Sequence, residues 1–151
     1  MPSFRLETVI CAPVADCFDL SLSVDAHTAS MGRSGERAVA GVTSGRLGLG
    51  DTVTWRARHL GITFRMTSAV TAYERPERFV DEQQHGPFAS WWHEHWFTPT
   101  GAGSTLMVDL VRFRSPLGPL GRVADAVVLG RYMPHLLRQR NAWLKHELEG
   151  R

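Results

Sequence analysis

The hydrophobic periodicity changes once along this chain, and that change constrains the fold more than any other feature. Between residues 51 and 114 apolar residues alternate with polar ones, which is typical of β-strands with one buried face. After Pro116 the apolar residues recur at helical spacing, which predicts one long helix from about Gly121 to Glu149. A meander of antiparallel strands must curl and bury its concave face, and the final helix is the only large element available to cover it.

The remaining segments complete the expected order of elements. A first strand is predicted over 3–10, followed by short helices over 13–22 and 25–31, the second capped by Asp25. Pro134 lies inside the final helix, where it removes a backbone hydrogen bond, so a kink is expected there. The further strands are expected over 37–42, 52–60, 62–73, 79–84, 89–98 and 104–114.

Composition narrows the class of protein. With 151 residues and 43% hydrophobic residues, the chain suits one domain spanning 1–151. It has no run of about 18 apolar residues, so stable membrane insertion is not expected. The N-terminus lacks the pattern of a signal peptide, which indicates a cytoplasmic protein. A net charge of +2 without a basic and aromatic patch argues against nucleic acid as a partner.

Two histidines alternate on the expected strand 89–98. Successive side chains of a strand point to opposite faces, so His93 and His95 share one face with Trp91 and Phe97. If that face points inward, the tryptophans of the other face are partly exposed. A homodimer contact or another partner surface is one interpretation of them.

The neighbouring strands add Asp81, Gln83 and Asp109 to the histidine face, and four interpretations remain open. The group is a satisfied polar network in the core, a polar anchor in an apolar pocket, an acid–base site, or a metal site. In the acid–base interpretation His93 or His95 acts with Asp109. In the metal interpretation Asp109 or His85 is a third ligand. No Glu follows the histidine pair as in cupin-type sites, so we predict neither a metal nor a cofactor.

Several short motifs carry a resemblance to a known family. They are Pro76–Phe79 (Pro-x-x-Phe), Asp81–Gln83, Gly86–Phe88, His93–His95 and Pro116–Gly121 before the last helix. With the order of elements, they resemble the START-like superfamily, also called SRPBCC, Bet v 1-like or helix-grip. The closest likeness is to its bacterial members described as polyketide cyclase/dehydrase or lipid-transport proteins.

The resemblance implies an α+β fold in which a curved antiparallel sheet wraps around the C-terminal helix and encloses a hydrophobic cavity. Proteins of this kind mostly bind lipids, sterols or polyketides, a minority are aromatase/cyclases, and others bind protein partners. The superfamily has no shared catalytic motif, so no catalytic residue transfers by position.

We therefore expect non-covalent binding or transport of a hydrophobic small molecule, such as a lipid, isoprenoid or polyketide. The alternative is a cyclase or aromatase that uses His93, His95 and Asp109; a third class is an assembly partner. The arginines of the final helix, Arg140 among them, are expected on its solvated face, and binding to an anionic membrane surface is the second interpretation. The residues predicted to contact ligand are Met66, Phe79, Asp81, Gln83, Trp91, His93, His95, Phe97, Met107, Asp109, Val111, Phe113, Val127 and Tyr132.

Overall fold

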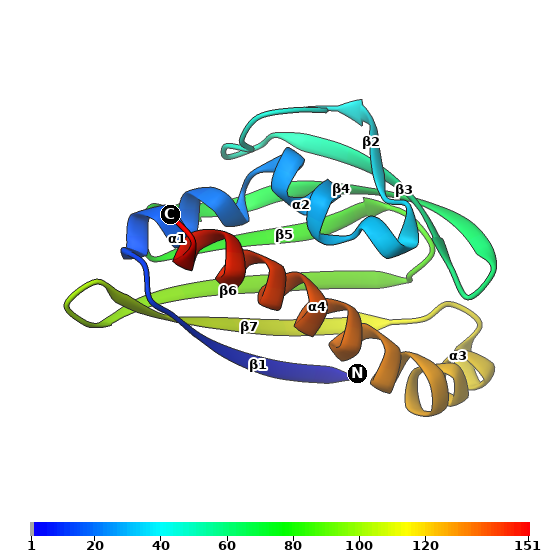
Figure 1. Ribbon diagram of the computed structural model, residues 1–151. Helices are drawn as coiled ribbons and strands as arrows, with labels where there is room; N and C mark the ends of the chain where they lie inside the picture. Colours follow the sequence, from blue (N-terminus) through cyan, green and yellow to red (C-terminus); the bar gives the residue numbers. More distant parts are fainter. Residues whose placement is uncertain (1) are drawn as a thin grey trace.

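The computed structural model describes residues 2–151, and its largest element is one curved antiparallel sheet. The sheet order is β1-β7-β6-β5-β4-β3-β2, so every strand except β1 lies beside its neighbour in sequence. The concave face of the sheet holds the C-terminal helix (Figure 1). The strands are β1 Ser3–Ile10, β2 Arg37–Gly41, β3 Thr52–His59, β4 Ile62–Glu74, β5 Arg78–His85, β6 Ser90–Gly101 and β7 Ser104–Arg114.

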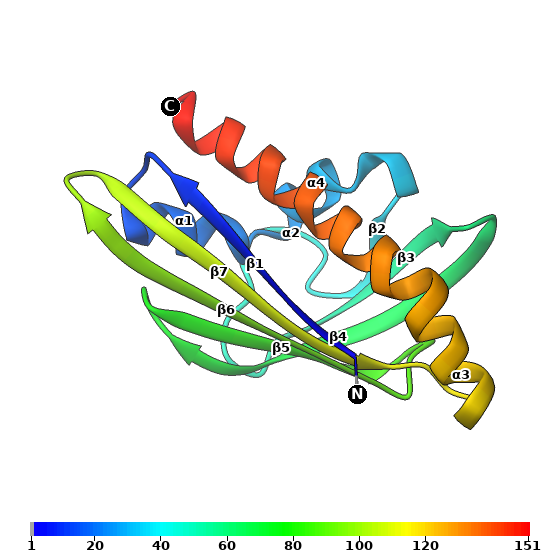
Figure 2. The same ribbon diagram turned by 90° about the horizontal axis from the view of Figure 1, so that it is seen from below.

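The helices lie on one side of this sheet. The short helices α1 (Val14–Ser21) and α2 (Val24–Ser30) connect β1 to β2, with a 3₁₀ turn, η1, at Gly32–Ser34. The C-terminal helix α4 (Gly130–Glu149) crosses the concave face, and Figure 2 shows it lying over the strands. The predicted curved sheet around a long final helix is therefore confirmed.

The N-cap residue of helix α2 differs from the prediction. The cap of α2 is Ser23, whose hydroxyl accepts a hydrogen bond from the backbone N–H of Ala26. Asp25 was expected in that role, but its carboxylate instead accepts from the backbone N–H of Gly45. A serine just before the first helical residue satisfies an amide that the helix itself leaves unpaired.

The C-terminal helix begins earlier than expected and contains a wider turn. It starts with α3 (Gly118–Ala124), continues through a π-helical turn, η2, at Asp125–Leu129, and then becomes α4. Pro134, where a kink was expected, is buried inside α4, and the π-helical turn η2 ends five residues before it. There the backbone N–H of Gly130 donates to the carbonyl of Asp125, five residues back.

A β-bulge changes which residues of β4 face inward. Regular alternation would place Ala72 on the same face as Val70, but the register shifts between them, so Ala72 pairs with Val80 and Tyr73 pairs with Phe79. The extra residue moves the following side chains to opposite faces.

The solid part of the core lies at the α1 end of the sheet. Phe18 of α1 is fully buried and makes edge-on contacts with Phe79 and Phe97, with ring centroids 5.5 and 5.4 Å apart. Met107 and Leu144 complete the same cluster. Helix α1 therefore closes this end of the space between the sheet and α4.

We predict that Gly121→Ala destabilises the protein although alanine favours helices more than glycine does. A Cβ atom at Gly121 would overlap the backbone carbonyl oxygen of Pro116, which cannot move away as a flexible side chain could. The expected loss is about 1–3 kcal/mol of unfolding free energy, measured by urea denaturation. Gly32→Ala is the matched control, because nothing lies within 4 Å of its added Cβ. Equal stability of the two variants would contradict this packing.

Candidate functional site

A cavity of about 310 Å³ lies between the concave face of the sheet and the helices. Strands β3 to β6 supply one wall, and α2 and α4 supply the other. Its volume is at the lower end of the range for small-molecule pockets. The apolar wall includes Leu22, Val24, Val53, Trp55, Ala57, Phe64, Met66, Phe88, Trp91, Met133, Leu136 and Leu137.

The polar groups of the cavity are concentrated where β5, β6 and β7 lie side by side. In the register of these strands Asp81 is directly opposite His93, and His95 is directly opposite Asp109. The alternation expected from the sequence therefore brings both histidines and both carboxylates to one face of the sheet.

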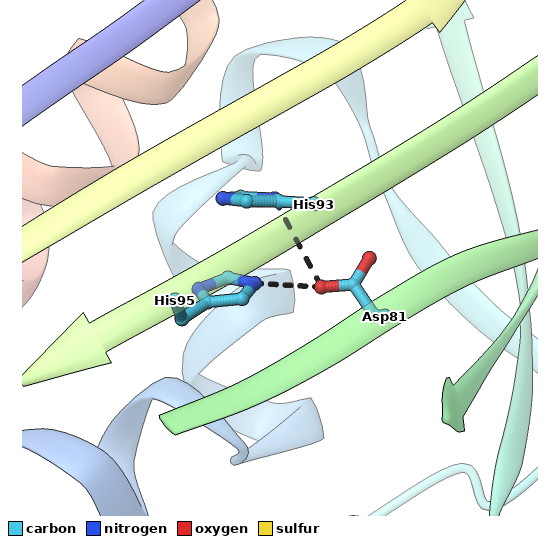
Figure 3. A group of neighbouring side chains, drawn as sticks. All are labelled: Asp81, His93 and His95. Atoms are coloured by element: carbon cyan, nitrogen blue, oxygen red, sulfur yellow. Dashed lines mark hydrogen bonds and ion pairs between the residues drawn. The ribbon is translucent and has the colours of Figure 1, made fainter. Parts of the chain in front are cut away.

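The short hydrogen bonds of this group join residues that are not directly opposite each other in the sheet. His93 Nε2 donates to Asp109 Oδ1 at 2.8 Å, and His95 Nε2 donates to Asp81 Oδ2 at 2.6 Å. The two imidazole rings are stacked with centroids 3.7 Å apart, and Phe79 stacks on the other side of His95 at 4.0 Å. Figure 3 shows both rings beside the Asp81 carboxylate.

Helix α4 contributes the remaining partners of Asp109. Asn141 Nδ2 donates to Asp109 Oδ2 at 2.7 Å, and Arg140 Nη1 donates to Asp109 Oδ1 at 3.3 Å. Arg140 Nη1 also donates to the side-chain oxygen of Asn141 at 3.0 Å. Asp109 is fully enclosed, so these neighbours and His93 stabilise its charge, and His95 Nδ1 lies 3.5 Å from its Oδ1.

The pKa shifts follow from burial and from these contacts. Burial and the nearby His93 lower the pKa of His95 to about 3, so its ring is neutral near neutral pH. Burial by itself raises the pKa values of Asp81 and Asp109. Hydrogen bonds from the histidines, with the charge of Arg140, reverse that effect and hold both carboxyl pKa values below their usual range.

Three side chains of the cluster can still form hydrogen bonds with a molecule in the cavity. Asp81 is the least buried member, and its Oδ1 has no hydrogen bond within residues 2–151. His93 Nδ1 lies 3.9 Å from Asp81 Oδ2, and it has no hydrogen bond within the same residues and is not fully enclosed. The same is true of the Nε and Nη2 donors of Arg140. His95 Nδ1 is different, because it is enclosed and has no partner among these residues.

The donor types of Asp81, His93 and His95 suit a metal ion, but the arrangement of the rings does not. These three residues lie close enough together to offer one ligand atom each. A metal ion bound at about 2.0 Å by two imidazoles lies in the plane of both rings, so two stacked rings must open into a wide wedge to share one ion. The planes are instead inclined by only 23°, close to a parallel stack. A ring would have to rotate before both histidines could bind the same ion.

A second polar group lines the cavity nearer to the β3–β4 turn. His27 Nε2 hydrogen-bonds to Glu36 Oε1 at 2.8 Å, and its ring stacks on Trp55. His59 Nδ1 hydrogen-bonds to the Tyr132 hydroxyl at 2.9 Å, which joins β3 to α4. Burial lowers the pKa of His59 and raises that of Tyr132.

The structure divides the predicted ligand contacts into two sets. Seven line the cavity: Met66, Phe79, Asp81, Trp91, His93, His95 and Tyr132. The other seven lie elsewhere: Gln83, Phe97, Met107, Asp109, Val111, Phe113 and Val127.

The residues outside the cavity have identifiable roles. Phe97 and Met107 belong to the solid core beneath α1, and Val111 and Phe113 pack in a second apolar cluster with Trp91 and Leu137. The Gln83 amide pairs with both the N–H and the carbonyl of Phe88 and thereby braces the β5–β6 hairpin. Val127 points to solvent and is 67% exposed.

The prediction that Arg140 lies on a solvated face is wrong, because it is only 4% exposed. A signal was present in the sequence. Arg140 lies four residues after Leu136 and four before Leu144, on the apolar stripe of the helix, so its side chain must point toward the sheet. His27, Glu36 and Trp55 were also missed as cavity residues, because no local pattern links α2 to β3.

The tryptophans on the opposite face of β6 are partly covered by arginines. Arg112 stacks over Trp92 at 4.5 Å, and Arg78 lies over Trp96 at 5.4 Å. Trp96 remains 37% exposed. The expected exposure is therefore present but reduced.

Comparison with known proteins identifies the fold. No family model and no curated protein matches the chain. Solved structures do match, among them a START superfamily protein from Mycobacterium smegmatis, with a TM-score of 0.74 and 14% identity, covering 98% of this chain and 97% of that one. The Zhui aromatase/cyclase from Streptomyces sp. R1128 matches with a TM-score of 0.74 and 13% identity, covering 98% and 93%.

A third match is Ara h 8.0201, with a TM-score of 0.64 and 15% identity over 95% of this chain and 97% of that one. Identities this low establish the fold alone. The chain therefore has the helix-grip fold of START-like proteins, as the sequence motifs indicated. Within residues 2–151, the structure contains no helix long and apolar enough to cross a membrane.

We predict that His95 makes the protein less stable as the pH falls toward 5. In the unfolded chain His95 binds a proton near pH 6.5, whereas in the folded protein it does so only near pH 3. Between these values the unfolded state holds more protons, so acid favours unfolding. The expected loss is about 2 kcal/mol between neutral pH and about pH 5, measured by urea denaturation.

His95→Gln should flatten this dependence, because the amide keeps a donor toward Asp81 but does not titrate. His146→Gln, at an exposed position of α4, is the control and should behave as the wild type. An unchanged slope in His95→Gln would show that His95 is not the neutral buried group.

Proposed function

We propose that this protein binds a hydrophobic small molecule non-covalently in the cavity between the sheet and α4. The observation that carries this proposal is a space of about 310 Å³ with a mainly apolar wall and two polar groups, of which the Asp81, His93 and His95 cluster is the more compact. Burial of apolar ligand surface would supply most of the affinity, at about 25 cal/mol per Å². The modest volume favours one compact molecule or single chain over a lipid with two long chains.

The polar cluster would orient that molecule. Asp81 Oδ1 can accept a hydrogen bond from a ligand hydroxyl, and Arg140 Nε and Nη2 can donate to a ligand carbonyl oxygen. A ligand carboxylate fits less well, because Asp81 and Asp109 already place two negative charges beside Arg140. We therefore favour an uncharged ligand with neighbouring hydroxyl and carbonyl groups, a chemistry common in polyketides.

Filling the cavity should abolish binding without unfolding the protein. Ala57 lines the cavity, so Ala57→Leu would occupy ligand space with apolar atoms. We expect at least a 10-fold loss of affinity for a hydrophobic fluorescent dye, with the thermal midpoint unchanged or raised. Ala102→Leu, on the exposed β6–β7 turn, is the matched control.

Native mass spectrometry of the purified protein, with extraction of any bound compound, would identify the ligand. Dye affinity that Ala57→Leu and Ala102→Leu alter equally would place the binding site outside the cavity.

A specific geometry supports catalysis as a second candidate function. Asp109 accepts a hydrogen bond from Nε2–H of His93, which leaves Nδ1 of that ring available at the cavity wall to accept a proton from a substrate. A carboxylate that holds one nitrogen of a histidine while the other faces a substrate is a common arrangement for proton abstraction. The structural likeness to an aromatase/cyclase is consistent with this role.

Two variants separate this role from simple binding. His93→Gln removes the base but should leave dye binding within a few fold, while reducing any cyclisation of a polyketide substrate by at least 100-fold. The double variant His93→Gln with His95→Gln tests whether the second histidine can substitute. Unchanged turnover of the double variant would eliminate the enzymatic candidate.

A further inference from the structure

The segment before α4 is an amphipathic helix whose apolar face points to solvent. In α3 and η2 the buried positions are Gly121 and Asp125, a small residue and a polar one. Asp125 accepts hydrogen bonds from the backbone and hydroxyl of Ser115 and thereby anchors the segment to the end of β7. The exposed positions of this segment include Arg122 and, with Leu117 just before α3, five large apolar residues: Leu117, Leu120, Val123, Val127 and Val128.

The β3–β4 turn extends this apolar surface. Leu60 and Ile62 are each at least 58% exposed, as are Leu117, Leu120, Val123 and Val127. Together with Val128, this end of the molecule holds seven of the twelve large hydrophobic side chains that are exposed among residues 2–151. Such concentration is unusual for a surface that faces only water.

The same end of the molecule is basic. Its connections, residues 58–65, 84–90 and 114–131, contain one carboxylate, that of Asp125, which is 3% exposed. All the arginines of these connections are exposed, and none forms an ion pair within residues 2–151. They are Arg58, Arg65, Arg114, Arg122 and Arg131.

The cavity reaches the surface at this end. Leu60 is both 61% exposed and part of the cavity wall, and Pro87, Phe88 and Leu129 line the cavity from the neighbouring connections. In Figures 1 and 2, α3 and the turn between β3 and β4 lie toward the same end of the sheet.

We propose that this apolar and basic end docks reversibly on an anionic lipid membrane. Large apolar side chains would enter the boundary between headgroups and acyl chains, while the surrounding arginines would contact lipid phosphates. Docking would place the mouth of the cavity against lipid, from which a hydrophobic ligand could pass directly inside. That consequence rests on the proposed ligand binding, whereas docking itself does not.

The charge pattern favours a membrane over a second copy of the chain. A symmetric dimer through this surface would bring the arginines of both copies together, with no exposed carboxylate in these connections to compensate them. An anionic bilayer supplies the missing negative charge over a broad surface.

The test is flotation of the intact protein with vesicles of phosphatidylcholine, with and without phosphatidylglycerol. The wild type should float with the anionic vesicles, bind neutral vesicles at least 10-fold more weakly, and be released by salt. Leu120→Ser with Val127→Ser should reduce vesicle affinity by about 10-fold or more. Arg122→Gln with Arg131→Gln should reduce it by about fivefold for each arginine.

Matched controls distinguish binding through this surface from non-specific adsorption of exposed apolar or basic residues to the vesicles. Leu49→Ser removes a leucine that is 65% exposed in the loop before β3, at the opposite end of that strand, and Arg33→Gln removes an exposed arginine in η1. Both should float as the wild type does, and thermal midpoints of all variants should agree.

Three results would overturn the proposal: no flotation of the wild type, equal loss in the Leu49→Ser control, or a dimer in solution that Leu120→Ser converts to monomer. The last result would assign the surface to self-association. Dye binding, measured in parallel without vesicles, reports on the proposed ligand cavity independently.

Discussion

The buried carboxylate of Asp109 is the constraint on which the arrangement of this protein depends. It lies on β7, fully enclosed, and receives hydrogen bonds from His93 of the sheet and from Arg140 and Asn141 of α4. An unpaired charge in such a place is strongly unfavourable, so the helix must present these two residues to this strand. The contact sets the position of α4 along the sheet, and the next two turns toward its N-terminus carry Leu136 and Tyr132 over the cavity.

The space under α4 is filled at one end and hollow at the other. Phe18 of α1 closes the first end through edge-on aromatic contacts, while the second end is bounded by turns and by Leu129 of η2. The polar cluster lies between them, so a molecule in the cavity would meet Asp81, His93 and Arg140 at its inner end. The apolar, basic outer end is continuous with that cavity. The proposed ligand binding and the proposed membrane docking are therefore compatible, because they use two parts of one continuous region, the cavity and its outer end.

The fold was predictable because periodicity reports which side of an element is buried. Strict alternation placed Asp81, His93 and His95 on the inner face, and the register confirms that they meet. Alternation could not distinguish Phe97, which lies beneath Phe18, from residues that line the cavity, because that depends on where a helix from another part of the chain is packed. Arg140 was misplaced for a related reason: arginine is ordinarily solvated, and its burial requires a carboxylate that only the folded chain supplies.

By itself, the sequence determined the order of elements, the inner face of each strand and the presence of a long helix to cover them, since these follow from local spacing of apolar residues. Only the tertiary structure decided which inner residues line the cavity, which nitrogen of each histidine is hydrogen-bonded, and that Leu120, Val123 and Val127 of α3 and η2 point outward. Those outcomes depend on contacts between segments distant in sequence, such as Gly121 against Pro116 and Asp109 against Arg140. No local pattern encodes such contacts, because their energies arise only when the partners are brought together.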